Sequence, residues 1–263
     1  MKTELIKTAI AWGNSSGVRV PKEWEGKKTK IQLIEDSIKE DIIQYLIDND
    51  LLKNILGIYL TGSYARGEET IESDIDILII TDTINKEITY GNYEILLISK
   101  KELDKKIKNS LYLYSQIKEA KTISNRQLIE KYKSLNITTP LKRYLKEIKM
   151  ITKLNMMIVL LEKTKGKNID ESLAYSIILR LRETLMINSI KNNKIYSKKD
   201  LLTILETYDS KLSYYKAYQK IKKNQKSKKI LDAKIGKNLL KITKKLILTI
   251  EKNGKKKENQ KRN

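Results

Sequence analysis

Two strongly apolar runs, at residues 55–60 and 75–80, place the strongest constraint on the fold of this chain, and only Asp76 interrupts the second of them. Their length and their Ile and Leu content are typical of buried β-strands. A third run of the same kind lies at residues 93–98. Residues 37–52 place apolar side chains three and four positions apart, which predicts an amphipathic helix before the first strand. Together these elements predict a compact α/β unit over about residues 37–110.

The C-terminal half of the sequence carries only a helical pattern. Beyond about residue 110 no further strand is predicted, because apolar positions recur every three or four residues. The helices expected in this half occupy residues 141–163, 170–190, 198–206 and 235–250. The predicted fold class is therefore α/β, with a small mixed-sheet core, an all-α C-terminal bundle and a short β-rich N-terminal element.

The N-terminal segment shows a separate β-rich pattern. Strands are predicted at residues 6–12, 18–20 and 30–34, with a turn at 13–17 and a helical turn at 22–24. So short a segment buries little apolar surface by itself. We expect it to gain a core only by dimerising or by docking on another surface.

Composition limits the chemistry that the chain can perform. The formal net charge of +22 favours polyanionic partners such as RNA or DNA, although an AT-rich genome or a hyperthermophile's composition explains the many lysines equally well. The absence of Cys and His excludes disulfides, thiol catalysis and Ser-His-Asp triads. No apolar run approaches the roughly 18 residues of a membrane span, so we expect a cytoplasmic protein without a membrane partner.

Two acidic residues stand out in the region between the first two predicted strands. Asp74 and Asp76 are two positions apart, so on a strand their side chains share one face at a spacing of about 6.6 Å. Two carboxylates on one face repel each other unless a cation lies between them. Hard oxygen ligands of this kind suit Mg²⁺ or Mn²⁺.

A small turn precedes these acids by about ten residues. Gly62 lacks a Cβ and allows a phosphate to approach the backbone, while the Ser63 hydroxyl and the amides of a following helix can bind phosphate oxygens. A Gly-Ser pair alone is also typical of an ordinary turn, and an Asp-x-Asp pair alone is typical of a solvated strand end or a helix cap. Together they predict a site for a metal and a nucleoside triphosphate.

This pattern of Gly62-Ser63 followed by Asp74-x-Asp76 resembles the signature of the nucleotidyltransferase superfamily related to DNA polymerase beta, and most closely its minimal prokaryotic branch. The resemblance implies that the Gly-Ser turn holds the triphosphate, that the paired acids bind two metal ions, and that a third acid lies on a neighbouring strand. Glu94 is the only acid in the run at 93–98 and is the candidate, with an ordinary edge residue as the alternative.

The same resemblance implies Mg²⁺-dependent transfer of a nucleoside monophosphate from an NTP, with ATP the expected donor, to a hydroxyl group. The catalytic and metal-binding candidates are Asp74, Asp76 and Glu94, and the nucleotide-binding candidates are Gly62, Ser63 and Arg66. For Arg66 a surface role is the alternative to phosphate binding. The nearby acids are expected to lie in a solvated loop; they are Glu68, Glu69 and Glu72.

The N-terminal residues 11–28 resemble the AbrB-like swapped-hairpin DNA-binding family, in which two chains interleave their hairpins. The resemblance implies a homodimer and DNA contacts, chiefly to phosphates. The candidate DNA-binding residues are Arg19, Lys22, Lys27 and Lys28. A hairpin that docks on the catalytic domain without any DNA role is the alternative.

The helical half, at residues 173–185 and 196–199, is similar to the domains that follow nucleotidyltransferase modules in antibiotic-modifying enzymes. The resemblance implies that the bundle covers the active-site cleft and selects the acceptor, whereas structural helix packing is the alternative. Arg180 and Arg182 are expected either to reach phosphate or to form ion pairs with Glu183.

These patterns predict four segments: an AbrB-like element at 1–36, a nucleotidyltransferase domain at 37–115, a helical domain at 116–252 and a basic tail at 253–263. The acceptor is left open between a partner protein's hydroxyl, as in antitoxins that adenylylate a toxin, an RNA end and a small molecule. The rival hypothesis is a DNA-binding transcriptional regulator or antitoxin whose transferase fold is inactive.

Overall fold

The structure is a computed structural model, and it describes residues 10–29, 38–70, 73–135 and 138–259. The chain divides into two compact units, Met1–Tyr45 and Leu46–Asn263. The division falls within helix α1 (Ile38–Asp48), which the amphipathic pattern predicted.

The first unit contains a short antiparallel hairpin of β1 (Ile10–Trp12) and β2 (Ser15–Gly17), followed by a 3₁₀ turn, η1 (Lys22–Trp24). The predicted strand at 18–20 was therefore wrong, since β2 lies within the predicted turn and ends before residue 18. The physical reason is that Gly13 adopts a left-handed conformation (φ 57°), so that a two-residue turn suffices where a five-residue turn was expected. The predicted strand at 30–34 and most of that at 6–12 lie outside the described residues.

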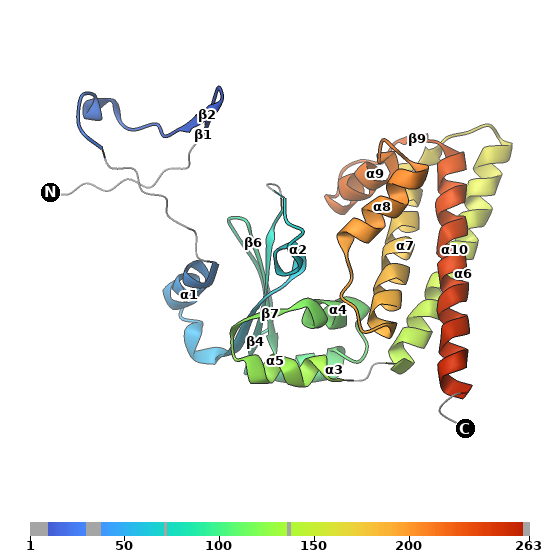
Figure 1. The fold of residues 1–263 in the computed structure, drawn as a ribbon, viewed down its shortest axis with the longest axis horizontal. Coiled ribbons are helices and arrows are strands. Elements are labelled where there is room, and N and C mark those ends of the chain that lie inside the picture. The colour runs from blue at the N-terminus through green and yellow to red at the C-terminus, as the bar shows by residue number, and fades with distance from the viewer. Residues whose placement is uncertain (1–9, 30–37, 71–72, 136–137, 260–263) are drawn as a thin grey trace. The chain divides into compact units, whose positions relative to one another are not determined.

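The second unit is built on a five-stranded mixed sheet with the strand order β5-β6-β4-β3-β7 (Figure 1). Its three central strands are β3 (Ile55–Leu60), β4 (Ile75–Thr81) and β6 (Tyr93–Ser99), and all three were predicted. Strand β4 runs antiparallel to β3 and parallel to β6. Most of their residues are buried because the apolar runs pack on both faces of the sheet.

Four further strands were not predicted, so the expectation of a strand-free C-terminal half was wrong. They are β5 (Lys86–Tyr90), β7 (Lys121–Ser124), β8 (Ile169–Asp170) and β9 (Lys229–Leu231). The edge strands β5 and β7 are short and mostly exposed, so they lack the apolar pattern that marks a buried strand. Strands β8 and β9 form a separate two-stranded pair.

Helices make up the rest of the second unit. The bundle helices that the periodicity predicted are α6 (Thr138–Thr164), α7 (Glu171–Lys191), α8 (Lys198–Tyr208) and α10 (Ala233–Asn259). The shorter segments are η2 (Leu52–Asn54), α2 (Gly62–Arg66), α3 (Lys100–Lys106), α4 (Leu111–Glu119), α5 (Arg126–Lys133) and α9 (Ser213–Lys222). Ser99 caps α3 and Asp170 caps α7 by accepting hydrogen bonds from backbone amides.

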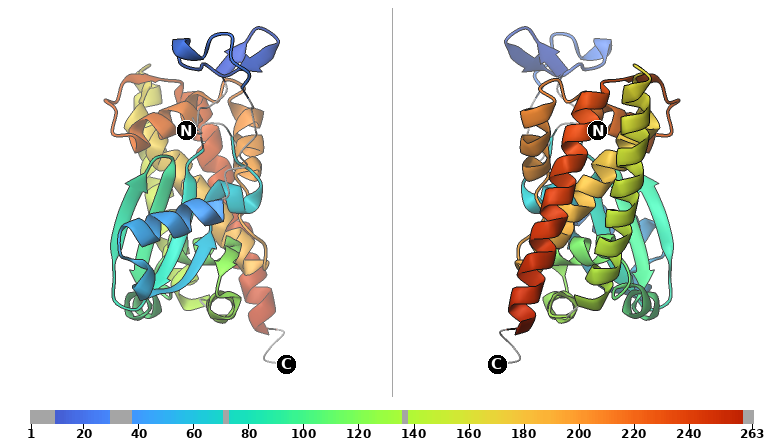
Figure 2. Two further views of the ribbon diagram at one scale, coloured as in Figure 1. Left: turned by 90° about the vertical axis from the view of Figure 1, so that its left-hand side faces the viewer. Right: turned by 90° about the vertical axis from the view of Figure 1, so that its right-hand side faces the viewer.

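One hydrophobic core continues from the sheet into the helical bundle. Tyr59 and Leu78 of the sheet belong to the same buried cluster as Ile177, Leu181 and Leu240 of the bundle. Helix α4 contacts both α2 and α7. Helices α6, α7 and α10 pack against one another (Figure 2). This continuous core fixes the bundle beside the ends of β3 and β4. No helix of the described ranges combines the length and the apolar character that crossing a bilayer requires.

Candidate active site

The paired acids lie at the beginning of a central strand. Asp76 is the second residue of β4, and Asp74 immediately precedes that strand. In the parallel pairing of β4 with β6, Asp76 stands opposite Glu94. Aligned residues on adjacent strands point to the same face and are about 4.8 Å apart. The sheet register therefore brings the predicted third acid beside Asp76.

The pKa of Asp76 depends on both neighbouring acids. Burial raises the pKa of Asp76 above its usual value, and the Glu94 carboxylate raises it further. Lys222 and Arg66 oppose this shift, while Asp74 adds to it. A carboxyl group that is partly buried among other acids favours a bound cation, because the cation removes the repulsion that raises the pKa.

The arrangement fits an ion that needs few protein ligands. Within the described part of the chain, no three acidic side chains come close enough together to form a complete metal-binding group. Mg²⁺ usually takes one or two carboxylates and completes its octahedral shell with water and substrate phosphates. The structure sets Asp76 opposite Glu94 but does not group all three acids, so one or two of these carboxylates would contact the ion and water and phosphates would supply its other ligands.

Gly62 lies directly against the Asp76 carboxylate. Its backbone is left-handed (φ 67°), and a Cβ placed there would lie 2.6 Å from Cγ of Asp76. Thr61, which precedes Gly62, joins the end of β3 to the start of β4. Both its amide and its hydroxyl donate hydrogen bonds to the carbonyl of Asp76. The Ser63 hydroxyl bonds to no residue of the described ranges and is half-buried beside this contact. The predicted bend and the predicted acid are thus immediate neighbours.

Glu119, at the end of α4, is a site residue that the sequence did not reveal. Its carboxylate accepts hydrogen bonds from the Gly62 amide (2.9 Å) and from the Arg66 guanidinium (2.6 Å). Burial raises the pKa of Glu119, whereas Arg66 and the Gly62 amide act in the opposite direction. Because Glu119 is 57 residues from Gly62 in the chain, no local spacing pattern connects them.

Glu68 corrects the expectation of a solvated loop, because only 7% of its side chain is exposed. One oxygen accepts from the Ser197 hydroxyl, and the other accepts from Arg66 and from the Lys198 amide at 2.9 Å each. Glu68 therefore joins the α2 turn to the start of α8. Glu69 is exposed as predicted, and Glu72 lies outside the described residues.

We expect Glu68→Gln to reduce the free energy of unfolding at pH 7 by about 1–3 kcal/mol, because it removes the charge from three hydrogen bonds. Burial disfavours the Glu68 carboxylate, but the bonds from Ser197 and Arg66 outweigh it and lower its pKa. A lowered carboxyl pKa stabilises the fold above the ordinary value of 4.5, and this contribution is lost as the pH falls through the lowered pKa.

Urea denaturation at pH 7 and at about pH 3 measures this dependence. The difference between wild type and Glu68→Gln should shrink at the lower pH. Glu69→Gln, which changes an exposed neighbour, is the matched control and should leave stability within about 0.5 kcal/mol of wild type. A Glu68→Gln effect that is equal at both pH values would contradict this role of the charge.

The two arginines of α7 differ in their partners. Arg180 forms an ion pair with Glu183 at 2.8 Å, which was one of the predicted alternatives. The Arg182 guanidinium instead lies 5.8 Å from the ring centroids of Tyr112 and Tyr196, and it donates to the Tyr218 hydroxyl. The Arg66 guanidinium lies 5.9 Å from the centroid of the Tyr196 ring. Tyr196 thus lies between a bundle arginine and the predicted nucleotide-binding arginine.

The predicted DNA-binding residues belong to the first unit. All four side chains are exposed; they are Arg19, Lys22, Lys27 and Lys28. Gly62 lies against Asp76, Glu94 is the register partner of Asp76, and Asp74 acts on the pKa of Asp76, with Ser63 and Arg66 on the adjoining turn. Their roles in binding and catalysis stay predictions. The contacts that Glu119 of α4, and Ser197 and Lys198 at the start of α8, make with this turn were not predicted.

A nucleotidyltransferase-like protein from Exiguobacterium sibiricum is 12% identical to this chain, with a TM-score of 0.34, and the match covers 81% of this chain and 75% of that one. A spectinomycin adenyltransferase from Enterococcus faecialis, solved with ATP and spectinomycin, is also 12% identical, with a TM-score of 0.40, and the match covers 80% of this chain and 98% of that one. No curated protein matches the chain. The nucleotidyltransferase domain family matches residues 39–197, more than half of the sequence. The chain belongs to the nucleotidyltransferase domain family and is a transferase of phosphorus-containing groups.

Proposed function

We propose that the protein transfers a nucleoside monophosphate from an NTP, with ATP the expected donor, to a hydroxyl acceptor in a Mg²⁺-dependent reaction. One observation carries the proposal: the Asp76 carboxylate lies against the left-handed Gly62 backbone and is influenced by Glu94 and Asp74. A triphosphate tail that enters this bend meets both the carboxylates and the Ser63 hydroxyl.

Each residue has a specific role in this proposal. Asp74, Asp76 and Glu94 would hold Mg²⁺, which supplies charge neutralisation and makes the acceptor hydroxyl easier to deprotonate. Gly62 gives the phosphates close access to the backbone. The Ser63 hydroxyl donates to a phosphate oxygen and orients the tail. Because the chain has no His, no imidazole base takes part in the reaction.

Two cationic side chains act on Asp76, and a third is linked to one of them through an aromatic ring; together they favour an anionic substrate. Arg66 and Lys222 both act electrostatically on Asp76, and Arg182 is linked to Arg66 through the ring of Tyr196. Arg66 forms ion pairs with Glu68 and Glu119. It would therefore attract a phosphate through its positive charge at a distance, or bind it directly after its side chain moves. These cations neutralise charge that builds up on the departing pyrophosphate.

Labelled nucleotides test the reaction type directly. Incubation with Mg²⁺, an acceptor mixture of protein, RNA and small hydroxyl compounds, and each NTP labelled at the α-phosphate should transfer the label to an acceptor. NTP labelled at the γ-phosphate should release its label as pyrophosphate. The variant Asp74→Ala/Asp76→Ala is the control. Transfer of the γ label would indicate phosphoryl transfer instead, and equal transfer by the double variant would remove the proposed site.

We expect Lys222→Met to lower kcat/KM for the NTP about fivefold to tenfold, because one positive charge near the acids is worth roughly 1 kcal/mol at a partly solvated site. Lys223→Met removes the neighbouring charge at the end of α9 and is the matched control. Steady-state kinetics at fixed ionic strength measure both variants. An equal loss in the two variants would show that only the overall charge of the chain matters.

A second proposed function is DNA binding by an AbrB-like N-terminal element that dimerises. The described part of this element has no buried side chain, and it exposes Ile10, Trp12 and Val20, at 41%, 68% and 41% of their surfaces. Interleaving with a second hairpin would bury them. In a gel-shift titration against salt, the full chain with Arg19→Ala/Lys22→Ala should bind DNA more weakly and with a smaller salt slope. Unchanged binding would place any DNA contact elsewhere.

A further inference from the structure

Helix α6 exposes a regular apolar stripe on a surface far in sequence from the paired acids. Met150, Leu154, Met157 and Leu161 are 68%, 55%, 60% and 52% exposed. Their spacing of four, three and four residues is the heptad spacing by which one helix packs against another. Large apolar side chains scattered singly over a surface need no explanation, but a contiguous row about 18 Å long indicates an interaction surface.

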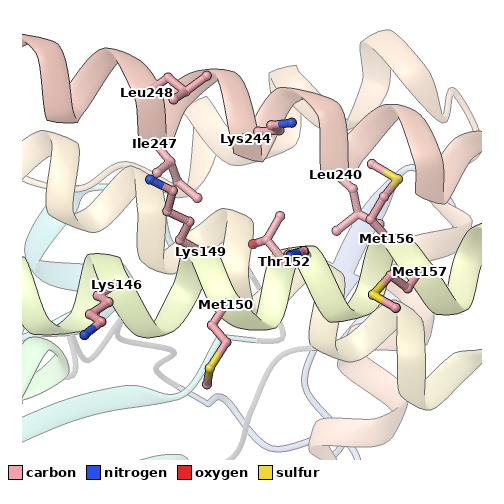
Figure 3. Close-up of a pocket in the computed structure, with 11 residues that line it drawn as sticks. Lys146, Lys149, Met150, Thr152, Met156, Met157, Leu240, Lys244, Ile247 and Leu248 are labelled. Carbon is pink, nitrogen blue, oxygen red and sulfur yellow. The ribbon is translucent and has the colours of Figure 1, made fainter.

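A groove of about 530 Å³ lies beside this stripe, between α6 and α10 (Figure 3). Met150 and Met157 line it together with Leu248 of α10, which is 42% exposed. Thr152 also lines the groove, and its hydroxyl is buried without a hydrogen-bond partner in the described part of the chain. An unpaired buried hydroxyl is costly, so this one favours a ligand that brings a polar group into the groove.

Lysines form the rim of the stripe and groove, and most of their charge is not neutralised. Lys149 forms an ion pair with Glu251 at 2.9 Å. Within the described ranges, Lys146, Lys153 and Lys244 form no ion pair, and all three line the groove. Lys146 and Lys153 are seven residues apart, so they lie on the same side of the helix, and Lys153 directly precedes Leu154 of the stripe, as the flanking charges of a coiled-coil helix do. The surface is thus apolar in the middle and positively charged along its edges.

These features together define the kind of partner. The heptad spacing favours a helix, the apolar centre favours an amphipathic one, and the lysine rim favours acidic residues on both sides of its apolar face. A second copy of this chain fits poorly, because it would bring the same lysine rim and a further charge of +22 to the interface. Methionines adapt readily to the shape of a bound helix.

We propose that the stripe of α6 and the adjoining groove bind an acidic amphipathic α-helix of a partner protein. Its apolar residues pack along Met150, Leu154, Met157 and Leu161, its acidic residues pair with Lys146 and Lys153, and one polar side chain reaches the Thr152 hydroxyl. This binding surface is independent of the proposed nucleotidyl transfer, since none of its residues belongs to the site at β4.

Binding of a fluorescent model helix to the full-length protein tests the proposal. The probe is a synthetic peptide of three heptads, about 21 residues, with Leu at the core positions and Glu at the flanking positions. A matched peptide keeps the Leu residues and carries Lys at the flanking positions. Fluorescence anisotropy near physiological salt should give saturable binding of the acidic peptide and at least about tenfold weaker binding of the basic one.

Point variants locate the binding. Met157→Asp and Lys153→Glu should each weaken the acidic peptide at least about tenfold, because they change the apolar centre and the charged rim. The matched controls Ile230→Asp and Lys241→Glu change an equally exposed apolar residue on β9 and a lysine of α10 outside the groove, and they should stay within about twofold of wild type. All four positions are exposed, so thermal melting should show folded proteins.

Three results would overturn the proposal. The first is failure of the acidic peptide to bind, and the second is equal weakening by the control variants, which would reduce the effect to general charge attraction. The third is a concentration-dependent dimer in sedimentation velocity that Met157→Asp dissociates, which would assign the surface to a second copy of the chain.

Discussion

Replacing Asp76 by Asn is expected to lower kcat/KM for nucleotidyl transfer about a thousandfold while leaving the fold intact. Asn has nearly the same shape, so it preserves the contact with Gly62 but removes the charge that Glu94 and Asp74 influence. The neutral amide also removes a source of repulsion among partly buried acids. The free energy of unfolding without Mg²⁺ should therefore stay equal to wild type or rise slightly.

Glu87→Gln is the matched control for this variant, because Glu87 is an exposed acid on edge strand β5 of the same sheet. It should retain activity within about twofold of wild type. Kinetics with the α-labelled NTP and urea denaturation without metal give the two measurements. An Asp76→Asn protein that is inactive because it is unfolded, or one that retains full activity, would contradict the role assigned to this carboxylate.

Gly62→Ala should abolish most activity and destabilise the protein more than any ordinary turn substitution. The left-handed backbone alone costs a non-glycine residue about 1–2 kcal/mol. The new Cβ would also overlap the Asp76 carboxylate, with Cγ only 2.6 Å away, and overpacking adds about 1–3 kcal/mol. Relief of this overlap requires the carboxylate to move, so we expect kcat to fall at least about a hundredfold.

Gly67→Ala separates the two causes. Gly67 has almost the same backbone angle (φ 66°) at the end of α2, but a Cβ there meets no atom within 4 Å. This control should show the backbone cost alone and keep most of the activity. Thermal unfolding and steady-state kinetics on both variants measure the difference. Equal effects would mean that the contact between Gly62 and Asp76 has no special importance.

The parts of the fold that local sequence determines were predicted well. The runs that became β3, β4 and β6 are apolar enough to be recognised singly. Gly62 and Asp76 become neighbours because β3 and β4 are antiparallel, so that the end of β3 lies beside the start of β4.

What the sequence did not reveal depends on contacts between distant residues. The edge strands β5 and β7 are polar, and they become strands only because β6 and β3 offer unpaired backbone groups. Glu119 and Ser197 are 57 and 129 residues from their partners Gly62 and Glu68. Such pairs leave no spacing pattern in one sequence, so three-dimensional coordinates are needed to find them.

A crystal structure with Mn²⁺ and a non-hydrolysable ATP analogue tests the central claim most directly. The account predicts anomalous density for Mn²⁺ at Asp74 and Asp76, with Glu94 beside it and the triphosphate within hydrogen-bond distance of the Ser63 hydroxyl. Metal density elsewhere, or a triphosphate bound away from the Gly62 bend, would contradict it.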